Sequence, residues 1–433
     1  MRFVSTRGQC PPVTADKALR AGLAPDGGLY VPEQLPLIDE AKTFGPSGLG
    51  EIGSLLLAPY FKDSMLENVI EQICADAFNF PTPLISLPSG PQVLELFHGP
   101  TGAFKDFGAR FLFRAFDHIA DQRDPITVLA ATSGDTGGAV GCAAEGALNA
   151  KAVILFPKDR ISAFQERQLC CWHEPVTALR VKGDFDACQA LVKQAFSNSE
   201  LSRQFGLTSA NSISIGRLLP QMSYWATAAI DAKAQTGKAP GLIIPTGNLG
   251  NAVAAIMARK MGLPIGPVVL ATNANPTLSE WKDRGAYQAR PAIATLANAM
   301  DVGAPSNFER LAHIDPSGID AVIRVEDDAI QARIRQTHSD DAYIACPHTA
   351  TGLEAYARLP SAHRQQRSWI IGATAHPYKF ADIVEPLIGE TIKPTPALAN
   401  VLERETRVTD IEATLEDLTS YLMATGAAGR VSV

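Results

Sequence analysis

One loop of the sequence combines glycine and asparagine at the junction of a strand-like run and a helix-like run. It follows the apolar run LIIPT at 242–246 and consists of Gly247, Asn248, Leu249, Gly250 and Asn251. Free backbone N–H groups and the positive end of a helix meet at such a loop, which predicts a site for an anion, in particular a phosphate. The loop lacks the GK[ST] of a P-loop and the glycine spacing of GxGxxG. An ordinary turn with Gly and Asn at positive φ is the alternative.

A second loop, ATSGDTGG at 131–138, also follows a strand-like run and opens a helix-like run. Its hydroxyl and N–H groups suit a carboxylate ligand. Because Ser, Asp and Thr are also common helix caps, an ordinary N-cap is an equal alternative.

Lys105 stands at the start of a helix-like run, between Phe104 and Phe107, in the loop HGPTGAFKD at 98–106. A positive charge is disfavoured at a helix N-terminus, so the amine is expected to be bonded to something. A partly desolvated lysine beside a phosphate site is what an aldehyde cofactor needs for a Schiff base. A solvated surface lysine is the commoner fate of this residue type and is the alternative.

The segment SANSISIGR at 209–217 carries amides, hydroxyls and Arg217 ahead of a long helix-like run. The planar guanidinium of Arg217 could bind a substrate phosphate, whereas a surface pair with a carboxylate is the more frequent fate of an arginine. His376, which precedes Pro377, is predicted to be a packed or capping histidine rather than a base, and His348 is predicted to lie at a plain helix start.

Strands that end at a common edge must position these loops. From about residue 92 onward, short β-branched runs alternate with longer amphipathic runs. This alternation predicts repeated βα units, and hence a mostly parallel sheet with helices on both faces and ligands at the carboxyl ends of its strands. The expected strands are at 126–131, 152–157, 176–181, 242–246, 268–272, 321–325 and 369–374.

The two ends of the chain break this alternation. The first 90 residues are rich in Pro and Gly turns, contain one helix-like stretch at about 51–77, and predict a small separate N-terminal domain. Residues 409–424, TDIEATLEDLTSYLMA, predict a terminal amphipathic helix.

Composition excludes several classes of protein. With 433 residues, of which 46% are apolar and 19% charged, the chain is too apolar for disorder. Its net charge of −7 argues against nucleic acid as a partner. Its seven cysteines lack CxxC spacing, which argues against a disulfide framework and a metal site and favours a reducing cytoplasm. Neither a signal peptide nor a membrane-spanning run is expected.

Six motifs occur together in the order found in one enzyme family. They are HGPTGAFKDFG, TSGDTGG, AFQERQL at 163–169, NSISIGR, TGNLGN and TAHPYKF. In this set the chain resembles the threonine synthases, pyridoxal-phosphate enzymes of the tryptophan-synthase-β fold type. STRG at 5–8 and GLAPDGGLYVPE at 22–33 extend the resemblance to nearly the whole chain and make it similar to the longer bacterial and fungal subgroup. Gly102 departs from the larger apolar residue that is usual before Ala-Phe-Lys.

The resemblance implies roles for individual residues of this chain. Lys105 is implied as the Schiff-base lysine and catalytic residue, Asp135 as the neighbour of the ring hydroxyl, and Thr374 as the partner of the pyridine nitrogen. The other implied roles are the N–H groups of Gly247, Asn248, Leu249, Gly250 and Asn251 for the cofactor phosphate, Thr132, Ser133 and Thr136 for the substrate carboxylate, and Asn211, Ser212 and Arg217 for the substrate phosphate.

A fold and an activity are implied as well. The fold would be a small N-terminal domain (1–90) followed by two doubly wound α/β subdomains of pyridoxal-phosphate fold type II (91–433). The activity would convert O-phospho-L-homoserine and water to L-threonine and phosphate, with pyridoxal 5′-phosphate, in a cytoplasmic monomer or homodimer without metal, nucleic acid or membrane. A lyase for another phosphorylated amino acid and a non-catalytic cofactor-binding relative are the alternatives. A nucleotide-binding oxidoreductase is disfavoured because the GxGxxG turn is missing.

Overall fold

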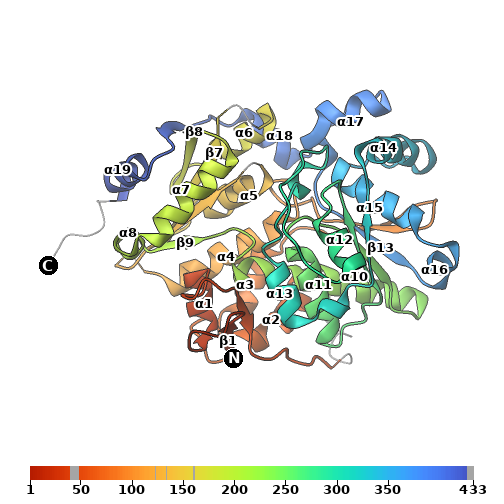
Figure 1. Cartoon of the computed structure of the whole chain (residues 1–433), viewed down its shortest axis with the longest axis horizontal. Helices are drawn as coiled ribbons and strands as arrows, with labels where there is room; N and C mark the ends of the chain where they lie inside the picture. The colour runs from red at the N-terminus through yellow and green to blue at the C-terminus, as the bar shows by residue number, and fades with distance from the viewer. Residues whose placement is uncertain (40–47, 122, 133, 159–160, 427–433) are drawn as a thin grey trace.

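Two β-sheets, each covered by helices, form the body of the computed structural model (Figure 1). The structure describes residues 1–39, 48–121, 123–132, 134–158 and 161–426. After a small N-terminal sheet, the chain enters the larger sheet, builds most of the smaller sheet, and then returns to the larger one. The chain after the N-terminal sheet therefore forms two α/β units joined by more than one crossing of the chain.

The larger sheet contains β4 (Leu84–Ser86), β5 (Gln92–Glu95), β10 (Gly241–Pro245), β11 (Val268–Thr272), β12 (Ala321–Arg324) and β13 (Trp369–Ala373). Its strand order is β12-β11-β10-β13-β5-β4. β4 is antiparallel to β5, and every other neighbouring pair is parallel. Because β10, β13 and β5 are adjacent and parallel, the loops that follow them leave the same edge of the sheet.

The smaller sheet contains β6 (Ile126–Ala131), β7 (Ala150–Pro157), β8 (Val176–Lys182), β9 (Leu207–Ser209) and β14 (Thr409–Glu412). Its order is β14-β8-β7-β6-β9, and all neighbouring pairs are parallel. All six residues of β6 are buried. Continuous apolar runs of this kind form strands that are covered on both faces, so the predicted doubly wound α/β fold is confirmed.

Small elements form the N-terminal part: β1 (Arg2–Ser5), β2 (Val13–Thr14), β3 (Tyr30–Pro32), α1 (Ala15–Ala21), α2 (Leu49–Phe61) and α3 (Ile70–Ala77). The prediction of one helix at 51–77 is wrong, because α2 ends at Phe61 and α3 begins only at Ile70. Asp63 between them adopts φ 63°, which no right-handed helix accommodates. Phe3 and Tyr60 belong to the same apolar core as Trp225, and a domain boundary at residue 90 stays a prediction.

Helices cover both main sheets. They are α4 (Lys105–Ile119), α5 (Asp135–Ala144), α6 (Ala163–Cys170), α7 (Phe185–Ser197), α8 (Ser199–Phe205), α9 (Ile215–Leu218), α10 (Gln221–Thr236), α11 (Gly250–Lys260), α12 (Thr277–Arg284), α13 (Phe308–Ile314), α14 (Asp327–Asp341), α15 (Pro347–Arg358), α16 (Ser361–Gln366), α17 (Ala381–Ile388), α18 (Pro396–Glu403) and α19 (Leu415–Gly426), with the 3-10 turns η2 (Asn298–Met300), η3 (Pro316–Gly318) and η4 (Pro377–Phe380).

The terminal segment 409–424 is helical only in its second part. Its first residues form β14, which extends the smaller sheet beside β8, and α19 begins at Leu415. Arg180 on β8 pairs with Asp410 on β14 across a 2.7 Å contact, and Ile411 is buried in the core. Residues 409–412 therefore form a strand rather than a helix, because they pair with β8, which is distant in the sequence and which no local pattern can reveal.

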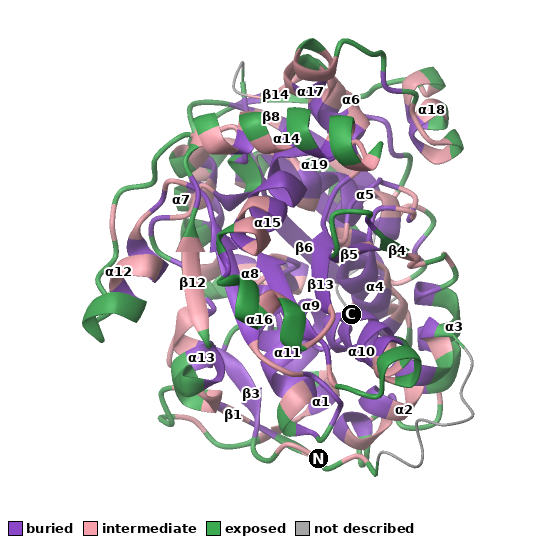
Figure 2. Cartoon of the chain, turned by 90° about the vertical axis from the view of Figure 1, so that its right-hand side faces the viewer, coloured by how far each residue is buried: buried purple, intermediate pink, exposed green. Residues whose placement is uncertain are grey.

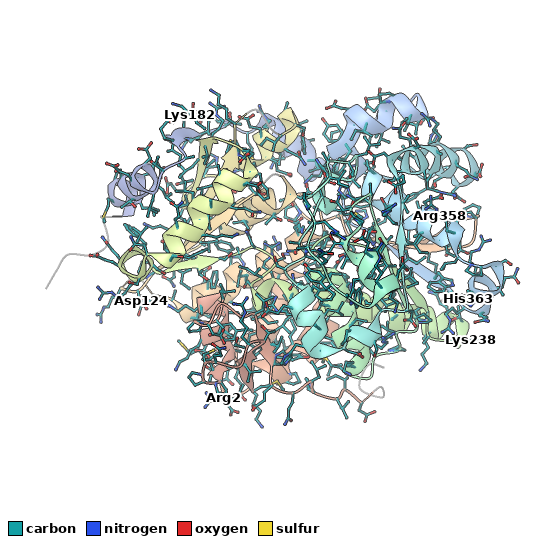
Figure 3. All side chains as sticks on the ribbon, in the orientation of Figure 1. Arg2, Asp124, Lys182, Lys238, Arg358 and His363 are labelled. Atoms are coloured by element: carbon teal, nitrogen blue, oxygen red, sulfur yellow. The ribbon has the colours of Figure 1, made fainter. Side chains whose placement is uncertain are left out.

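Burial separates the centre of the molecule from its rim. Figure 2 shows buried residues concentrated on the central strands and on α4, whereas α12 lies at the left-hand edge of that view, and Figure 1 shows α16 at the right-hand edge. α16 buries none of its residues. The labelled side chains of Lys182, Lys238 and Arg358 all lie on the periphery in Figure 3. Within the described ranges, no helix is long and apolar enough to cross a membrane, and no group of three or more His, Cys, Asp or Glu side chains could hold a metal ion.

Gly206 connects α8 to β9 and provides a test of the fold. Its φ of +58° is left-handed, and a Cβ there would lie 2.4 Å from the backbone oxygen of Pro125. We expect Gly206→Ala to lower the free energy of unfolding by about 2–4 kcal/mol, because strain adds to the clash. The control, Gly237→Ala, has φ +71° but no atom within 4 Å of the new Cβ, and should cost about 1 kcal/mol. Equal losses in denaturant unfolding would contradict the clash at Pro125.

Candidate active site

Loops from both sheets meet at one cavity, whose wall contains charged, polar and apolar side chains. The loops follow β5, β10 and β13 of the larger sheet and β6 and β9 of the smaller one. The lining includes ten residues named from the sequence, namely Lys105, Asp135, Ser212, Arg217, Gly247, Asn248, Leu249, Gly250, Asn251 and Thr374. The carboxyl ends of the strands therefore gather most of the expected residues at one place.

The loop after β10 forms a cradle of unused backbone donors. Leu249 adopts φ 65° and turns the chain sharply into α11, whose first residue is Gly250. Among the described residues, no acceptor takes a hydrogen bond from the backbone N–H groups of Gly247, Asn248, Gly250 or Asn251. Free N–H groups at the positive end of an 11-residue helix fit a phosphate.

Side chains of the same loop hold its shape. The Thr246 hydroxyl donates to Asn251 Oδ1 at 2.7 Å and accepts from the N–H of Leu249 at 3.2 Å, and Asn251 Nδ2 donates to the carbonyl of Pro245 at 2.9 Å. The side-chain amide of Asn251 is thus bonded within the loop, and only the backbone N–H of Asn251 is left for a ligand. A Cβ on Gly247 would lie 2.7 Å from Cα of Met300, so only glycine fits there.

Lys105 begins α4 with its amine in the cavity wall. Among the described residues, no hydrogen bond or ion pair holds the amine, which lies 4.7 Å from the centre of the Phe104 ring. Burial, helped by the positive charge of Arg217, lowers the pKa of Lys105 from 10.5 to about 8, although the charge of Asp135 opposes the shift. A neutral amine is therefore accessible near physiological pH.

Asp106 fixes the loop that presents Lys105. Its carboxylate accepts from the N–H of Thr101 at 2.9 Å and from the Thr101 hydroxyl at 2.6 Å, and its side chain is fully buried. A Cβ on Gly99 would lie 2.4 Å from Asp106 Oδ2. Gly102 adopts φ +67°, so the departure from a larger residue at this position suits the left-handed backbone.

Arg217 is a buried arginine without a carboxylate partner among the described residues. It is 4% exposed, its Nη1 donates to the carbonyl of Ala210, and its buried Nε has no hydrogen-bond partner. Burial lowers the pKa of Arg217 to about 10, against the opposing charge of Asp106. The alternative of a surface ion pair is therefore wrong, and the unused Nε–H suits an anionic ligand.

A second buried arginine, Arg310 on α13, holds the segment before α9 and was missed from the sequence. Its guanidinium donates to three carbonyls, those of Tyr30 at 3.0 Å, Ser212 at 3.4 Å and Ile213 at 2.6 Å. Asn248 Nδ2 donates to the Ser212 hydroxyl. These bonds join β3 of the N-terminal part, the segment at 211–214 and the cradle after β10.

Three of the described residues that were named from the sequence are absent from the cavity lining, namely Thr132, Thr136 and Asn211. Ser133 lies outside the described residues. The Thr132 hydroxyl accepts from the N–H groups of Gly134 at 3.1 Å and Gly137 at 3.0 Å, as the capping alternative predicts. Thr136 and Asn211 are both partly exposed, and Asn211 has a buried Oδ1 without a hydrogen-bond partner.

Four further residues lie in the cavity wall or contact the loops that form it, and the sequence either did not single them out or assigned them a plain role. His376 accepts from the N–H of Tyr378 at 3.2 Å and so acts as a cap, as predicted. His348, however, lines the cavity, and burial lowers its pKa to about 4, so it is neutral. Gln221 lines the wall and donates to the carbonyl of Arg217 at 2.8 Å. The remaining one, Lys379, lies 2.8 Å from Asp135 Oδ1 with no exposed side-chain surface.

Known proteins match successive parts of the chain. "Threonine synthase N terminus" matches residues 2–78, "Pyridoxal-phosphate dependent enzyme" residues 76–373, and "Threonine synthase, C-terminal" residues 349–422. The threonine synthase of Escherichia coli (strain K12) is 36% identical over 405 residues, which cover 90% of this chain and 92% of that relative. The chain belongs to the threonine synthase family.

Solved structures agree with this membership. The structure of pyridoxal-phosphate-bound threonine synthase from Brucella melitensis matches with a TM-score of 0.91 and 32% identity, covering 100% of both chains. The E. coli threonine synthase structure matches with a TM-score of 0.89 and 33% identity, covering 98% of this chain and 100% of that one. The function is that of a threonine synthase, a lyase with pyridoxal 5′-phosphate as cofactor. The free N–H groups of 247–251 and the free amine of Lys105 fit the phosphate and the aldehyde of this cofactor.

The lowered pKa of Lys105 leads to a pH-dependent expectation. A group protonated below about pH 8 becomes a nucleophile as the pH rises through that value. We therefore expect competitive acetylation of the cofactor-free chain to label Lys105 with a midpoint near pH 8, read by mass spectrometry. Peptides with exposed lysines in the same digest are the internal control. A Lys105 midpoint near 10.5 would show that its amine is as solvated as theirs.

Proposed function

We propose that this chain converts O-phospho-L-homoserine and water to L-threonine and phosphate, with Lys105 as the covalent anchor of the cofactor and the acid–base group. The observation that carries the proposal is a free, partly desolvated amine in one cavity with two separate anion sites. One is the cradle of N–H groups at 247–251, and the other is Arg217. A cofactor phosphate and a substrate phosphate need two such sites.

Several residues support the binding of the cofactor. When bound, pyridoxal 5′-phosphate supplies an aldehyde that condenses with amines and a ring that accepts electron density. The N–H groups of Gly247 to Asn251 would hold its phosphate, and Asp135 would accept a hydrogen bond from the ring hydroxyl. Thr374, 6% exposed at the end of β13, would face the pyridine nitrogen with a neutral hydroxyl. A neutral partner leaves that nitrogen largely unprotonated and tempers the electron sink.

The substrate would be held at both of its anionic ends. Arg217, Ser212 and Asn211 are proposed for the phosphate. The unused Nε–H of Arg217 supports this assignment. Asn211 would donate to the phosphate through Nδ2, because its unpartnered Oδ1 is an acceptor. The 132–136 segment at the start of α5, with Thr132, Ser133 and Thr136, is proposed for the carboxylate. The Thr132 hydroxyl already caps this turn, so Thr132 would act by shaping it.

Lys105 would also move protons at Cα and Cβ of the substrate. An amine with a pKa of about 8 exchanges protons readily near neutral pH, because both of its forms are populated there. His348 is neutral and accepts from the N–H of Ala299 at 3.1 Å, so it is engaged with the protein. We assign it to shaping the wall.

The cellular compartment and the oligomeric state of the enzyme are also proposed. All seven cysteines are free, which supports a reducing cytoplasm. One chain supplies all the residues proposed for the site, which supports a monomer or a homodimer with one site in each chain.

The test of the proposed function begins with trapping. Borohydride reduction of the purified chain should fix the cofactor on the peptide that contains Lys105. Lys105→Ala should abolish threonine formation, since neither the anchor nor the nearest acid–base group remains, while free cofactor should still bind weakly at the 247–251 cradle. Label on another lysine, or near-normal turnover of the variant, would refute the assignment.

Arg217→Leu tests the class of substrate. Removing one member of a desolvated charge pair costs roughly 2–5 kcal/mol, so kcat/KM for O-phospho-L-homoserine should fall about 30-fold or more. Absorbance of the bound cofactor should survive, because its phosphate lies at a different loop. The control, Arg114→Leu, removes a partly exposed pair with Asp117 at 3.8 Å and should change kcat/KM by less than about threefold. Equal falls for non-phosphorylated analogues would instead indicate a role in folding.

A further inference from the structure

Lys379 is a fully buried lysine that the proposed reaction does not use. It lies in η4, directly after β13, and its side chain has no exposed surface. Its amine donates to the carbonyl of Thr101 at 2.9 Å and to Gln168 Oε1 at 2.7 Å, and lies 2.8 Å from Asp135 Oδ1. A buried ammonium without a counter-ion is costly, and the carboxylate of Asp135 is the negative group in direct contact with it. The buried Asp106 carboxyl, whose pKa burial raises to about 6, also interacts with Lys379 but without direct contact.

The contacts of Lys379 join segments that are far apart in the sequence. Asp135 begins α5 and Gln168 belongs to α6, both of which pack on the smaller sheet, whereas Thr101 belongs to the loop that presents Lys105. Gln168 Nε2 also donates to the carbonyl of Thr101 at 3.0 Å. Figure 1 shows α6 and α17, the helix that follows η4, on opposite sides of the top of the molecule. The ammonium is therefore a junction between the two α/β units, directly behind the cavity.

We propose that Lys379 is a positioning residue, whose ammonium holds the Asp135 carboxylate in the cavity wall as a fixed negative charge and ties that wall to the loop that presents Lys105. The inference rests on the proposed function, because it takes Asp135 as part of the cofactor site. Its consequence is that Asp135 acts as a permanent acceptor and exchanges no proton with the reacting groups.

The electrostatics around Asp135 support this role. Burial alone would raise the pKa of the Asp135 carboxyl, but the charge and proximity of Lys379 hold it below its usual value. The other groups facing Asp135 that can carry positive charge are Lys105 from α4 and His348 from α15. The Cys346 thiol also faces Asp135, but burial raises the pKa of this thiol above its usual value, so it stays neutral. His348 is neutral, and Lys105 is half deprotonated near pH 8, so neither supplies a constant positive charge. Lys379 alone among these three is both fully buried and in direct contact with the carboxylate.

A set of stability measurements tests the pair on the full-length chain, with and without cofactor. Lys379→Met leaves the Asp135 carboxylate unpaired, so its pKa should rise, and Tm should fall by roughly 5 °C or more at pH 8.5 but less at pH 6, where protonation relieves the charge. Asp135→Asn leaves the Lys379 ammonium unpaired. The fall in Tm of this variant should be larger at pH 6 than at pH 8.5, because the unpaired amine is more fully charged at the lower pH. The double variant should recover most of the lost Tm.

A matched control and the contradicting outcomes complete this set. Lys260→Met removes a partly exposed pair with Asp315 at 3.5 Å and should shift Tm by less than about 2 °C at either pH. Equal losses at both pH values, or no recovery in the double variant, would overturn the proposal and leave Lys379 as a packing residue. If Lys379→Met yields no folded chain, a folded double variant supports the proposal and an unfolded one overturns it.

Cofactor affinity gives a readout that a packing role would not move. The dissociation constant of pyridoxal 5′-phosphate, measured by equilibrium titration, should be about tenfold higher in Lys379→Met than in wild type at pH 6, the equivalent of one charge-assisted hydrogen bond. The ratio should approach one at pH 8.5, where Asp135 is ionised again. A ratio that does not change with pH would overturn the proposal. Failure of the wild-type cofactor to attach to Lys105 would refute the proposed function instead, while the stability set still decides the pair.

Discussion

Buried positive charge without enough buried negative charge is the constraint on which this structure depends. Lys105 and Arg217 line one cavity, and the carboxylates nearest to them are already committed, Asp106 to Thr101 and Asp135 to Lys379. Burial therefore lowers the pKa values of both cations. Anionic ligands remove the cost of burying these unpaired cations, because they supply the negative charge that the nearby carboxylates do not. The free N–H groups of the 247–251 loop also favour an anionic ligand.

The architecture follows from the need to assemble this cavity. β5 and β13 are neighbours although they lie far apart in the sequence, and the chain between them builds most of the smaller sheet. The loop before α4 and the turn η4 therefore emerge side by side, opposite the loops that follow β6 and β9. Neither α/β unit contains the site by itself, and buried polar bonds such as that from Gln168 to Thr101 align the two halves.

Local patterns predicted much of the fold and the site. The runs 126–131 and 268–272 are β6 and β11 with the same bounds, because continuous apolar runs are typical of strands that are covered on both faces. Loops that follow strands reach the cavity for the same reason. What local patterns missed depends on distant partners: β14 forms only beside β8, and Lys379 and Arg310 are charged residues that the sequence alone would leave at the surface. Thr132 shows the limit within a correctly placed loop, since a capping hydroxyl and a binding hydroxyl have the same sequence signature.

Arg310 makes the N-terminal segment part of the energetics of the cavity. A single guanidinium bonds the carbonyl of Tyr30 on β3 and the carbonyls of Ser212 and Ile213 beside the cavity. Ligand binding in the cavity and docking of the N-terminal sheet thus act on one hydrogen-bond network, and thermodynamic reciprocity makes the effect of each on the other equal. Ligand bound at the cavity should slow amide hydrogen exchange in the backbone of β3, although no atom of that strand lines the cavity.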